Sequence, residues 1–259
     1  MDPKLASLLD EQYRLQIVGR TNRSNTILEY SVDLCVVEIS KPSQNVLQYG
    51  LSGLILDYVL ANSDVVWADL ASGNSIALRQ GKLFLEEHGL DPSRLRTYGF
   101  DVLPVDIEVI QHHITHWPKE YAETLLQQKY SPELHQCDIL TVEFPESPDI
   151  VTCSESLFWT DDPLKIFTNA AKQAKVGATI CMNRQSKAFY KAHDGSHSRL
   201  FQELIRRFDG LPGFDVRYYD SHAGLIVTKI DNCPMLDFGL ILVDKQMSRE
   251  GYVHTYVDA

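Results

Sequence analysis

The stretch that decides the fold is VVWADLASGNS, residues 65–75. It opens with the apolar run Val65–Ala68, which is typical of a buried parallel strand. Asp69 then introduces a turn of mostly small residues, and a helix is expected over residues 76–88, weakened by Gly81. A strand, a small-residue turn and a helix in this order indicate the first unit of a layered α/β sheet.

The same alternation continues toward the end of the chain. It predicts an α/β fold, a Rossmann-like, doubly wound, seven-stranded sheet that is mostly parallel and has an antiparallel C-terminal hairpin. Residues 1–62 are expected to form an N-terminal extension that caps a substrate pocket, and residues 63–259 the main domain. Further strands are expected at 14–40 (two or three), 96–100, 137–142, 149–153, 178–182, 215–230 and 236–243, and further helices at 44–61, 104–117, 119–130, 163–175 and 197–208.

Composition narrows the classes of function. The 259 residues are 44% hydrophobic and carry a net charge of −11, as expected for an acidic globular protein. Such a charge disfavours nucleic acid as a partner, because binding to the phosphate backbone depends on Lys and Arg. Five cysteines without a CxxC pair indicate a reducing compartment. The longest apolar segment, 51–61, is too short to span a bilayer, so we expect a cytoplasmic protein without a membrane partner.

Polar residues follow the predicted strands at their carboxyl ends. Asp69, Asp101 and Asp138 lie after or near three of them, and Ser154 and Glu155 follow the fourth. Ligands of doubly wound sheets bind at this edge, near the point where the strand order reverses. Carboxylates there suit the hydroxyl groups of a ribose and the amino groups of a ligand.

Residues 65–75 resemble the first motif of the class I S-adenosylmethionine-dependent methyltransferases, in which an acidic residue and three alternating glycines follow an apolar strand. Asp69 matches the acidic position and Gly73 the middle glycine, whereas Ala71 and Ser75 stand at the other two glycine positions. Four later stretches resemble, in the expected order, the triplet beside the adenine, the fourth motif, the helix start after it and the turn before the fifth strand: residues 137–139, 149–159, 161–164 and 175–178.

The resemblance implies S-adenosylmethionine as the cofactor. Asp69 would order the turn or meet the cofactor's amino group, Asp101 would accept hydrogen bonds from the ribose, and Asp138 would accept one from the adenine. Alanine at position 71 fits if its φ is negative, and Ser75 is expected to cap the helix. The expected cofactor-binding residues are Asp69, Ala71, Gly73, Asp101, Asp138, Ile139 and Ser154.

The acceptor side of the site is expected after the fourth strand. Glu155 is the candidate catalytic base, and Phe158 and Trp159 are the candidate substrate-binding residues. The alternative for Glu155 is a solvent-facing acid at a helix start, and the alternative for the two aromatic residues is core packing. The predicted activity is methyl transfer to a small molecule, and a protein acceptor stays open.

Two rival functions remain open from the sequence. The first is a catalytically inactive methyltransferase-fold protein that binds or regulates, which the two absent glycines favour. The second is a nicotinamide-dependent oxidoreductase, although the turn lacks the G-x-G-x-x-G spacing of that class. No metal is expected, because the histidines at 112, 113 and 116 come without an HExxH motif or a cysteine cluster.

Overall fold

The computed structural model describes most of the chain from residue 51 onward and two short pieces before it. The strands expected between 14 and 36 and the helix expected at 104–117 therefore lie outside the described residues. The described ranges are 37–39, 47–49, 51–62, 64–73, 75–102, 119–153, 156–157, 160–183, 187–208, 211, 213–220, 224–232, 236–248 and 251–259.

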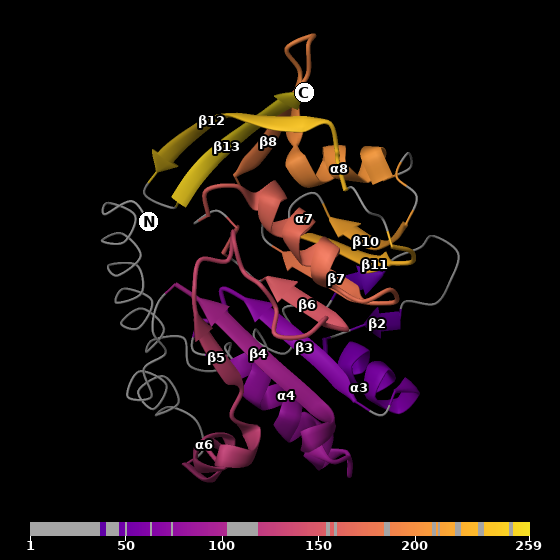
Figure 1. Ribbon diagram of the computed structural model, residues 1–259, viewed down its shortest axis with the longest axis vertical. Coiled ribbons are helices and arrows are strands. Elements are labelled where there is room, and N and C mark those ends of the chain that lie inside the picture. The colour runs from indigo at the N-terminus through magenta and orange to yellow at the C-terminus, as the bar shows by residue number, and fades with distance from the viewer. Residues whose placement is uncertain are drawn as a thin grey trace.

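A seven-stranded sheet forms the centre of the protein, as predicted (Figure 1). The chain runs outward from β3 through β4 to β5, then returns to the other side of β3 with β6 and β7. The strand order therefore reverses between β3 and β6, where ligands of such sheets bind. In spatial order the strands are β10 (Phe214–Asp220), β11 (Gly224–Lys229), β7 (Thr179–Asn183), β6 (Ile150–Cys153), β3 (Val65–Leu70), β4 (Leu95–Asp101) and β5 (Glu133–Gln136).

Six of these strands run in one direction and β11 alone is reversed. β3 to β7 pair in parallel, whereas β11 is antiparallel to both β7 and β10. The predicted antiparallel hairpin is therefore present, but it is formed by β10 and β11, which divide the stretch expected to be one strand at 215–230. The expected partner, 236–243, does not join this sheet.

Helices cover both faces of the sheet. α3 (Leu51–Ala61) and α4 (Ile76–Glu87) pack on one face, and α7 (Pro163–Gln173) and α8 (Leu200–Phe208) pack on the other. The alternating side chains of β3 serve both faces: Val65 and Trp67 join the α3–α4 core, and Ala68 and Leu70 join the α7–α8 core. Both faces are therefore buried, as the continuous apolar run at 65–68 predicted.

Gly81 has a packing role in α4. A Cβ atom at this position would lie 2.7 Å from Cζ3 of Trp67 and 3.3 Å from Cδ1 of Ile55. The glycine weakens the helix intrinsically, but it lets α4 approach β3 and α3 closely. α3 shares this core although residues 51–61 belong to the predicted extension, and the domain boundary at residue 62 stays a prediction.

Further expected elements differ from the structure. The strand expected at 137–142 is a turn and loop, because the strand itself lies earlier, at 133–136. The helix expected at 119–130 divides into α6 (Lys119–Leu125) and the 3₁₀ turn η3 (Gln128–Tyr130). The helix expected at 44–61 begins only at residue 51, since residues 47–49 form β2 (Leu47–Tyr49), which pairs with β1 (Val37–Ile39).

A second sheet of four strands lies at one end of the molecule (Figure 1). A hairpin of the last residues forms half of it, and an excursion between β7 and α8 forms the rest. The first residues of the helix expected at 197–208 belong to this excursion. In spatial order the strands are β12 (Leu240–Ser248), β13 (Gly251–Asp258), β8 (Ala188–Lys191) and β9 (His197–Arg199).

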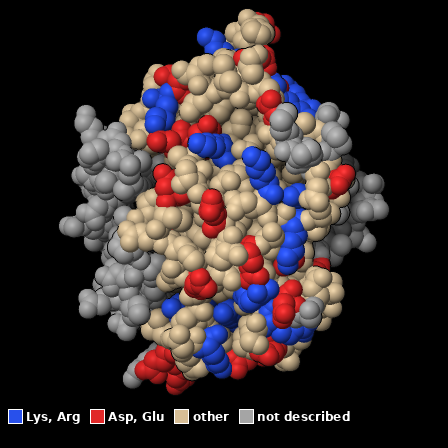
Figure 2. Space-filling model, in the orientation of Figure 1, with Lys and Arg blue, Asp and Glu red and all other residues tan. Residues whose placement is uncertain are grey.

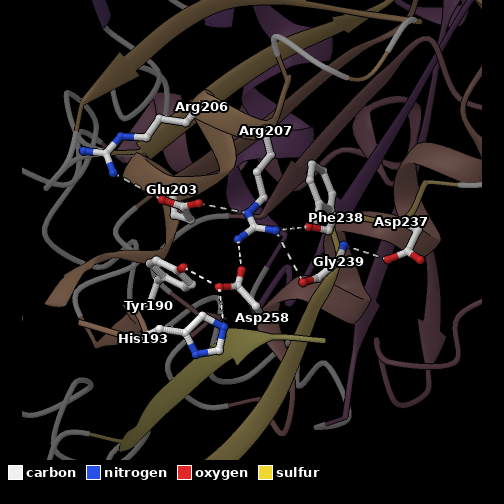
Figure 3. Close-up of polar contacts among 9 residues, drawn as sticks. All are labelled: Tyr190, His193, Glu203, Arg206, Arg207, Asp237, Phe238, Gly239 and Asp258. Carbon is white, nitrogen blue, oxygen red and sulfur yellow. Dashed lines mark hydrogen bonds and ion pairs between the residues drawn. The ribbon is translucent and has the colours of Figure 1, made fainter. Parts of the chain in front are cut away.

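Arg207 joins the second sheet to α8 (Figure 3). Its Nη2 donates to Oδ1 of Asp258 at 2.5 Å, and its Nε donates to Oε1 of Glu203 at 3.0 Å. Its Nη1 also donates to the carbonyl oxygens of Phe238 (2.6 Å) and Gly239 (3.3 Å). One guanidinium group thus connects a helix, the last strand and the segment that leads into β12.

We expect Arg207→Met to lower the free energy of unfolding by about 2–3 kcal/mol, because Glu203 and Asp258 would lose their hydrogen-bonded cation in a partly buried place. Urea titration followed by circular dichroism measures this change. Arg206→Met is the matched control, since this exposed neighbour makes only a 3.3 Å ion pair with Glu203 and its loss should cost less than about 0.5 kcal/mol. Equal losses in the two variants would contradict the assigned role.

Among the described residues, every helix is too short or too polar to cross a lipid bilayer.

Candidate functional site

Three of the described residues in the turn between β3 and α4 lie in the left-handed region. The φ angles are 54° at Ala71, 52° at Gly73 and 54° at Ser75. These are the three positions where the resembling motif has glycine. The condition that φ at Ala71 be negative is therefore not met, and each of the two non-glycine residues costs about 1–2 kcal/mol in this conformation.

The end of β4 holds the turn in place. The backbone N–H of Ser72 donates to the carbonyl oxygen of Phe100 at 3.1 Å, and that of Gly73 donates to Oδ2 of Asp101 at 2.9 Å. Within the turn, the N–H of Ser75 donates to the carbonyl oxygen of Ser72 at 2.8 Å. The expected carboxylate of Asp101 therefore lies beside the turn and already orders its backbone.

Ser75 occupies the N-cap position of α4 but does not cap it with its side chain. Its hydroxyl donates instead to the hydroxyl oxygen of Ser72 at 3.1 Å. The expectation of a serine cap was wrong, because a residue at φ 54° aims its side chain back into the turn rather than toward the free N–H groups of the first helical turn.

Asp69 is a buried carboxylate at the carboxyl end of β3, with 8% of its surface exposed. Oγ1 of Thr152 donates to its Oδ1 at 2.6 Å, and Nε1 of Trp67 donates to the same hydroxyl at 2.8 Å, so the threonine proton is directed at the carboxylate. Among the described residues, no Lys, Arg or His pairs with Asp69. The carboxyl group is thus buried beside other polar atoms without a positive charge.

This environment raises the pKa of Asp69 from 3.8 to about 7. Burial is the main cause and the charge of Asp101 adds to it, while the hydrogen bond from Thr152 acts in the opposite direction. Burial and the same two carboxylates also raise the pKa of the Cys153 thiol, so this cysteine stays protonated. Near neutral pH, Asp69 is poised to gain or lose a proton when charge arrives nearby.

Asp138 and Ile139 follow β5, near the third strand end. Asp138 is exposed, and its Oδ1 accepts a hydrogen bond from the N–H of Leu140 at 2.9 Å. Ile139 is buried, with 4% exposed, in the core that also contains Phe100. The side chain of Asp138 thus orders a turn in this structure, and contact of the two residues with an adenine stays a prediction.

The predicted residues after β6 lie outside the described part of the chain: Ser154, Glu155, Phe158 and Trp159. The second sheet holds the residues that come next. Nε2 of His254 lies 2.8 Å from the carbonyl oxygen of Thr160, and the hydroxyl of Tyr256 donates to Oδ1 of Asp162 at 2.6 Å. That carboxylate also caps α7 by accepting from the N–H of Lys165 at 3.2 Å.

Burial lowers the pKa of His254 and makes it a neutral hydrogen-bonding residue near pH 7. No sequence pattern pointed to Thr152, Ser72 or the β12–β13 hairpin as parts of this region. The strand at 251–258 was not predicted either, although its run of β-branched and aromatic residues is typical of one.

Among the described residues, no cluster of three or more His, Cys, Asp or Glu side chains could hold a metal ion. The histidines at 112, 113 and 116 lie outside those residues, so the expectation of no metal stays a prediction.

Comparison with known proteins gives a family match for the middle of the chain and several solved structures that are similar to it. Residues 84–182 match the family model described as a methyltransferase domain, whereas no curated protein matches the chain significantly. An O-methyltransferase family protein from Burkholderia thailandensis is similar, with 15% identity over 69% of this chain and 55% of that chain and a TM-score of 0.43.

Two further solved structures are similar. One is a sugar N-methyltransferase from Streptoalloteichus sp., with 16% identity over 52% of this chain and 46% of that chain and a TM-score of 0.33. The other is the ribosomal protein L11 methylase from Lactobacillus delbrueckii subsp. bulgaricus, with 11% identity over 69% of this chain and 76% of that chain and a TM-score of 0.39. The chain spans about half the length of the Burkholderia and Streptoalloteichus structures.

The matched residues 84–182 extend from α4 to β7 and thus contain three consecutive parallel strands, β4 to β6, and most of a fourth. The glycine-motif turn lies just before them, after the central strand β3. Residues 84–182 thus match a methyltransferase domain, and the sheet that contains them, with the turn after β3, has the architecture that the sequence resemblance implied.

Proposed function

We propose that the protein transfers a methyl group from S-adenosylmethionine to a small-molecule acceptor. The observation that carries this proposal is the left-handed turn at 71–75, flanked by the carboxylates of Asp69 and Asp101 at the carboxyl ends of β3 and β4. The turn supplies the backbone geometry and the carboxylates supply the charge that this cofactor requires.

The residues of the site fit the cofactor chemically. S-adenosylmethionine carries a positive sulfonium and a positive ammonium group, and Asp69 is a buried carboxylate without a cationic partner among the described residues. A Cβ atom at Gly73 would meet nothing within 4 Å, so the backbone there has open space in front of it. In this proposal Asp101 also accepts from the ribose hydroxyls, and Asp138, Ile139 and Ser154 line the adenine side.

The cofactor supplies an electrophilic methyl group on a positively charged sulfur. The protein then needs only to place an acceptor atom in line with that group and to take up the acceptor's proton. In this proposal Glu155 accepts the proton, while Phe158 and Trp159 cover the acceptor and exclude water. The second sheet fixes the chain that follows these residues, because His254 hydrogen-bonds to residue 160 and Tyr256 to residue 162.

The charge of the protein favours a small acceptor over a nucleic acid. The net charge is −11, and on the face shown in Figure 2 the Lys and Arg side chains of the described residues are scattered among Asp and Glu, without a continuous basic area. The experiment below distinguishes a small-molecule acceptor from a protein acceptor.

One observation favours a second candidate, an inactive protein of the same fold. Ala71 and Ser75 stand in left-handed conformations that glycine would adopt without strain. In this candidate the turn serves only the fold, and the protein does not bind the cofactor. The two candidates differ in a single measurable property, the affinity for the cofactor.

Isothermal titration calorimetry with S-adenosylmethionine and S-adenosylhomocysteine tests the proposal. We expect dissociation constants in the micromolar range for both. To identify the acceptor class, the protein is incubated with the tritiated methyl donor and a cell extract, and the products are separated by ultrafiltration. Label in the small-molecule fraction supports the proposal. Label in the protein fraction shows that the acceptor is a protein instead. No heat from folded protein would leave the inactive candidate.

A further inference from the structure

Gly99 lies directly beside the site, in β4, where its register partner is Asp69 of β3. A Cβ atom at Gly99 would lie 2.8 Å from Oγ of Ser72 and 2.9 Å from Oγ of Ser75. It would also lie 2.8 Å from Cδ2 of Leu134. The two serine hydroxyls therefore occupy the space that a side chain at position 99 would need.

These hydroxyls belong to the strained part of the turn. Ser75 is buried, with 1% exposed, and its hydroxyl donates to Ser72 at 3.1 Å. The same two residues are joined by the backbone hydrogen bond from the N–H of Ser75. This hydroxyl pair thus closes the turn across the two places, 71 and 75, where non-glycine residues hold a positive φ.

A left-handed conformation at a non-glycine residue persists only where the surrounding structure determines it. The turn has two such residues and therefore needs more support than a turn with three glycines. The support comes from β4: the carbonyl of Phe100 and the carboxylate of Asp101 each accept a hydrogen bond from the turn, and the absence of a side chain at Gly99 leaves room for its two serine hydroxyls.

We propose that Gly99 and the Ser72–Ser75 hydroxyl pair hold the turn in its cofactor-binding shape and replace the conformational freedom that glycines at 71 and 75 would give. This inference rests on the proposed function. Gly99 is a positioning residue, because it acts on the cofactor only through the turn. Ala71 and Ser75 in place of glycine are then compensated by Gly99 and the hydroxyl pair, and they do not indicate that cofactor binding is lost.

The first test is Gly99→Ala, measured as affinity for S-adenosylhomocysteine by calorimetry. Leu134 can move away, because it is 38% exposed, but the buried hydroxyl of Ser75 cannot. We expect the turn to shift and the affinity to fall by at least about tenfold. The matched control is Gly53→Ala in α3, where a Cβ would meet nothing within 4 Å, and its affinity should equal that of the wild type.

The second test is rescue. In the triple variant Gly99→Ala, Ser72→Ala, Ser75→Gly, the new methyl group fills the space of the two removed hydroxyls and glycine supplies the positive φ. We expect the affinity to return to within about threefold of the wild type, which a general loss of stability at position 99 would not allow. Urea titration of each variant ensures that only folded protein is compared.

The outcomes separate the inference from the proposed function. If the wild type binds neither ligand, the proposed function fails. If the wild type binds, then equal affinity in Gly99→Ala, or no recovery in the triple variant, overturns the inference alone. Should Gly99→Ala not fold, Ser72→Ala decides: it removes the hydroxyl pair without a steric conflict, and unchanged affinity there also overturns the inference.

Discussion

Replacing Asp69 by asparagine should stabilise the protein at pH 8 and weaken its binding of S-adenosylmethionine. The pKa of Asp69 is about 7 in the folded state against 3.8 for the free group, so folding favours the protonated form. The folded state therefore holds more protons than the unfolded state between these two values, and stability falls as the pH rises from about 4 to about 7. The full penalty is present above pH 7.

The size of this penalty follows from the shift. A change of about three pKa units corresponds to about 4 kcal/mol for a fully buried group. Asparagine has no charge to bury, and its side-chain oxygen can still accept the hydrogen bond from Thr152. We therefore expect Asp69→Asn to raise the free energy of unfolding at pH 8 by a few kcal/mol and to remove much of its decline between pH 5 and 8.

Binding should change in the opposite direction. A cationic ligand favours the ionised carboxylate, so the wild type should bind S-adenosylmethionine more tightly at pH 8 than at pH 6 and release a proton when it binds near pH 7. Asp69→Asn should lose this pH dependence and bind the cationic cofactor about tenfold or more weakly. S-adenosylhomocysteine lacks the sulfonium charge and should lose less.

Calorimetry in buffers of different ionisation enthalpy counts the released proton, and urea titration from pH 5 to 8 gives the stability. Asp64→Asn is the matched control, because Asp64 is exposed just before β3 and undergoes the same chemical change. A variant at Asp69 that is less stable than the wild type at pH 8, with affinity unchanged, would show that this carboxylate is a structural group only.

The sequence predicted those parts of the fold that depend on local pattern. The run at 65–68 was predicted as a buried strand and a helix was predicted from Pro163, because an apolar run and a proline at the first helical turn act within a few residues. Local pattern did not predict which sheet a strand joins, because that depends on the strand it pairs with. Residues 236–243 could not be assigned to the second sheet, since only pairing with 251–258 places that strand.

The site was predictable to a similar degree. Asp69 and Asp101 could be placed together because parallel strands end at one edge of a sheet, and the structure brings both to the same turn. Thr152 could not be found, because its role is a contact between residues 83 apart in the chain. The positive φ at Ala71 could not be predicted either. Alanine normally avoids this region, and the surrounding turn and β4, not the residue itself, impose the conformation.

Substitution of Asp101 should strongly lower the affinity for S-adenosylmethionine and for S-adenosylhomocysteine, by a similar factor for each. Its Oδ2 holds the N–H of Gly73, so Asp101→Ala leaves a partly buried donor without an acceptor and also removes the carboxylate proposed for the ribose. We expect the affinity for S-adenosylmethionine and S-adenosylhomocysteine to fall about hundredfold, because the ribose is common to both.

Asp101→Asn separates the two roles of this residue. The amide oxygen can still accept from Gly73, so the turn should persist and the affinity should fall only about tenfold. Both variants also remove the charge that raises the pKa of Asp69, so the pH midpoint of proton release should move below that of the wild type. Calorimetry from pH 5 to 8 gives both quantities. An unchanged midpoint would mean that the two carboxylates are not coupled, and equal losses in alanine and asparagine variants would mean that the charge, not the turn, determines binding.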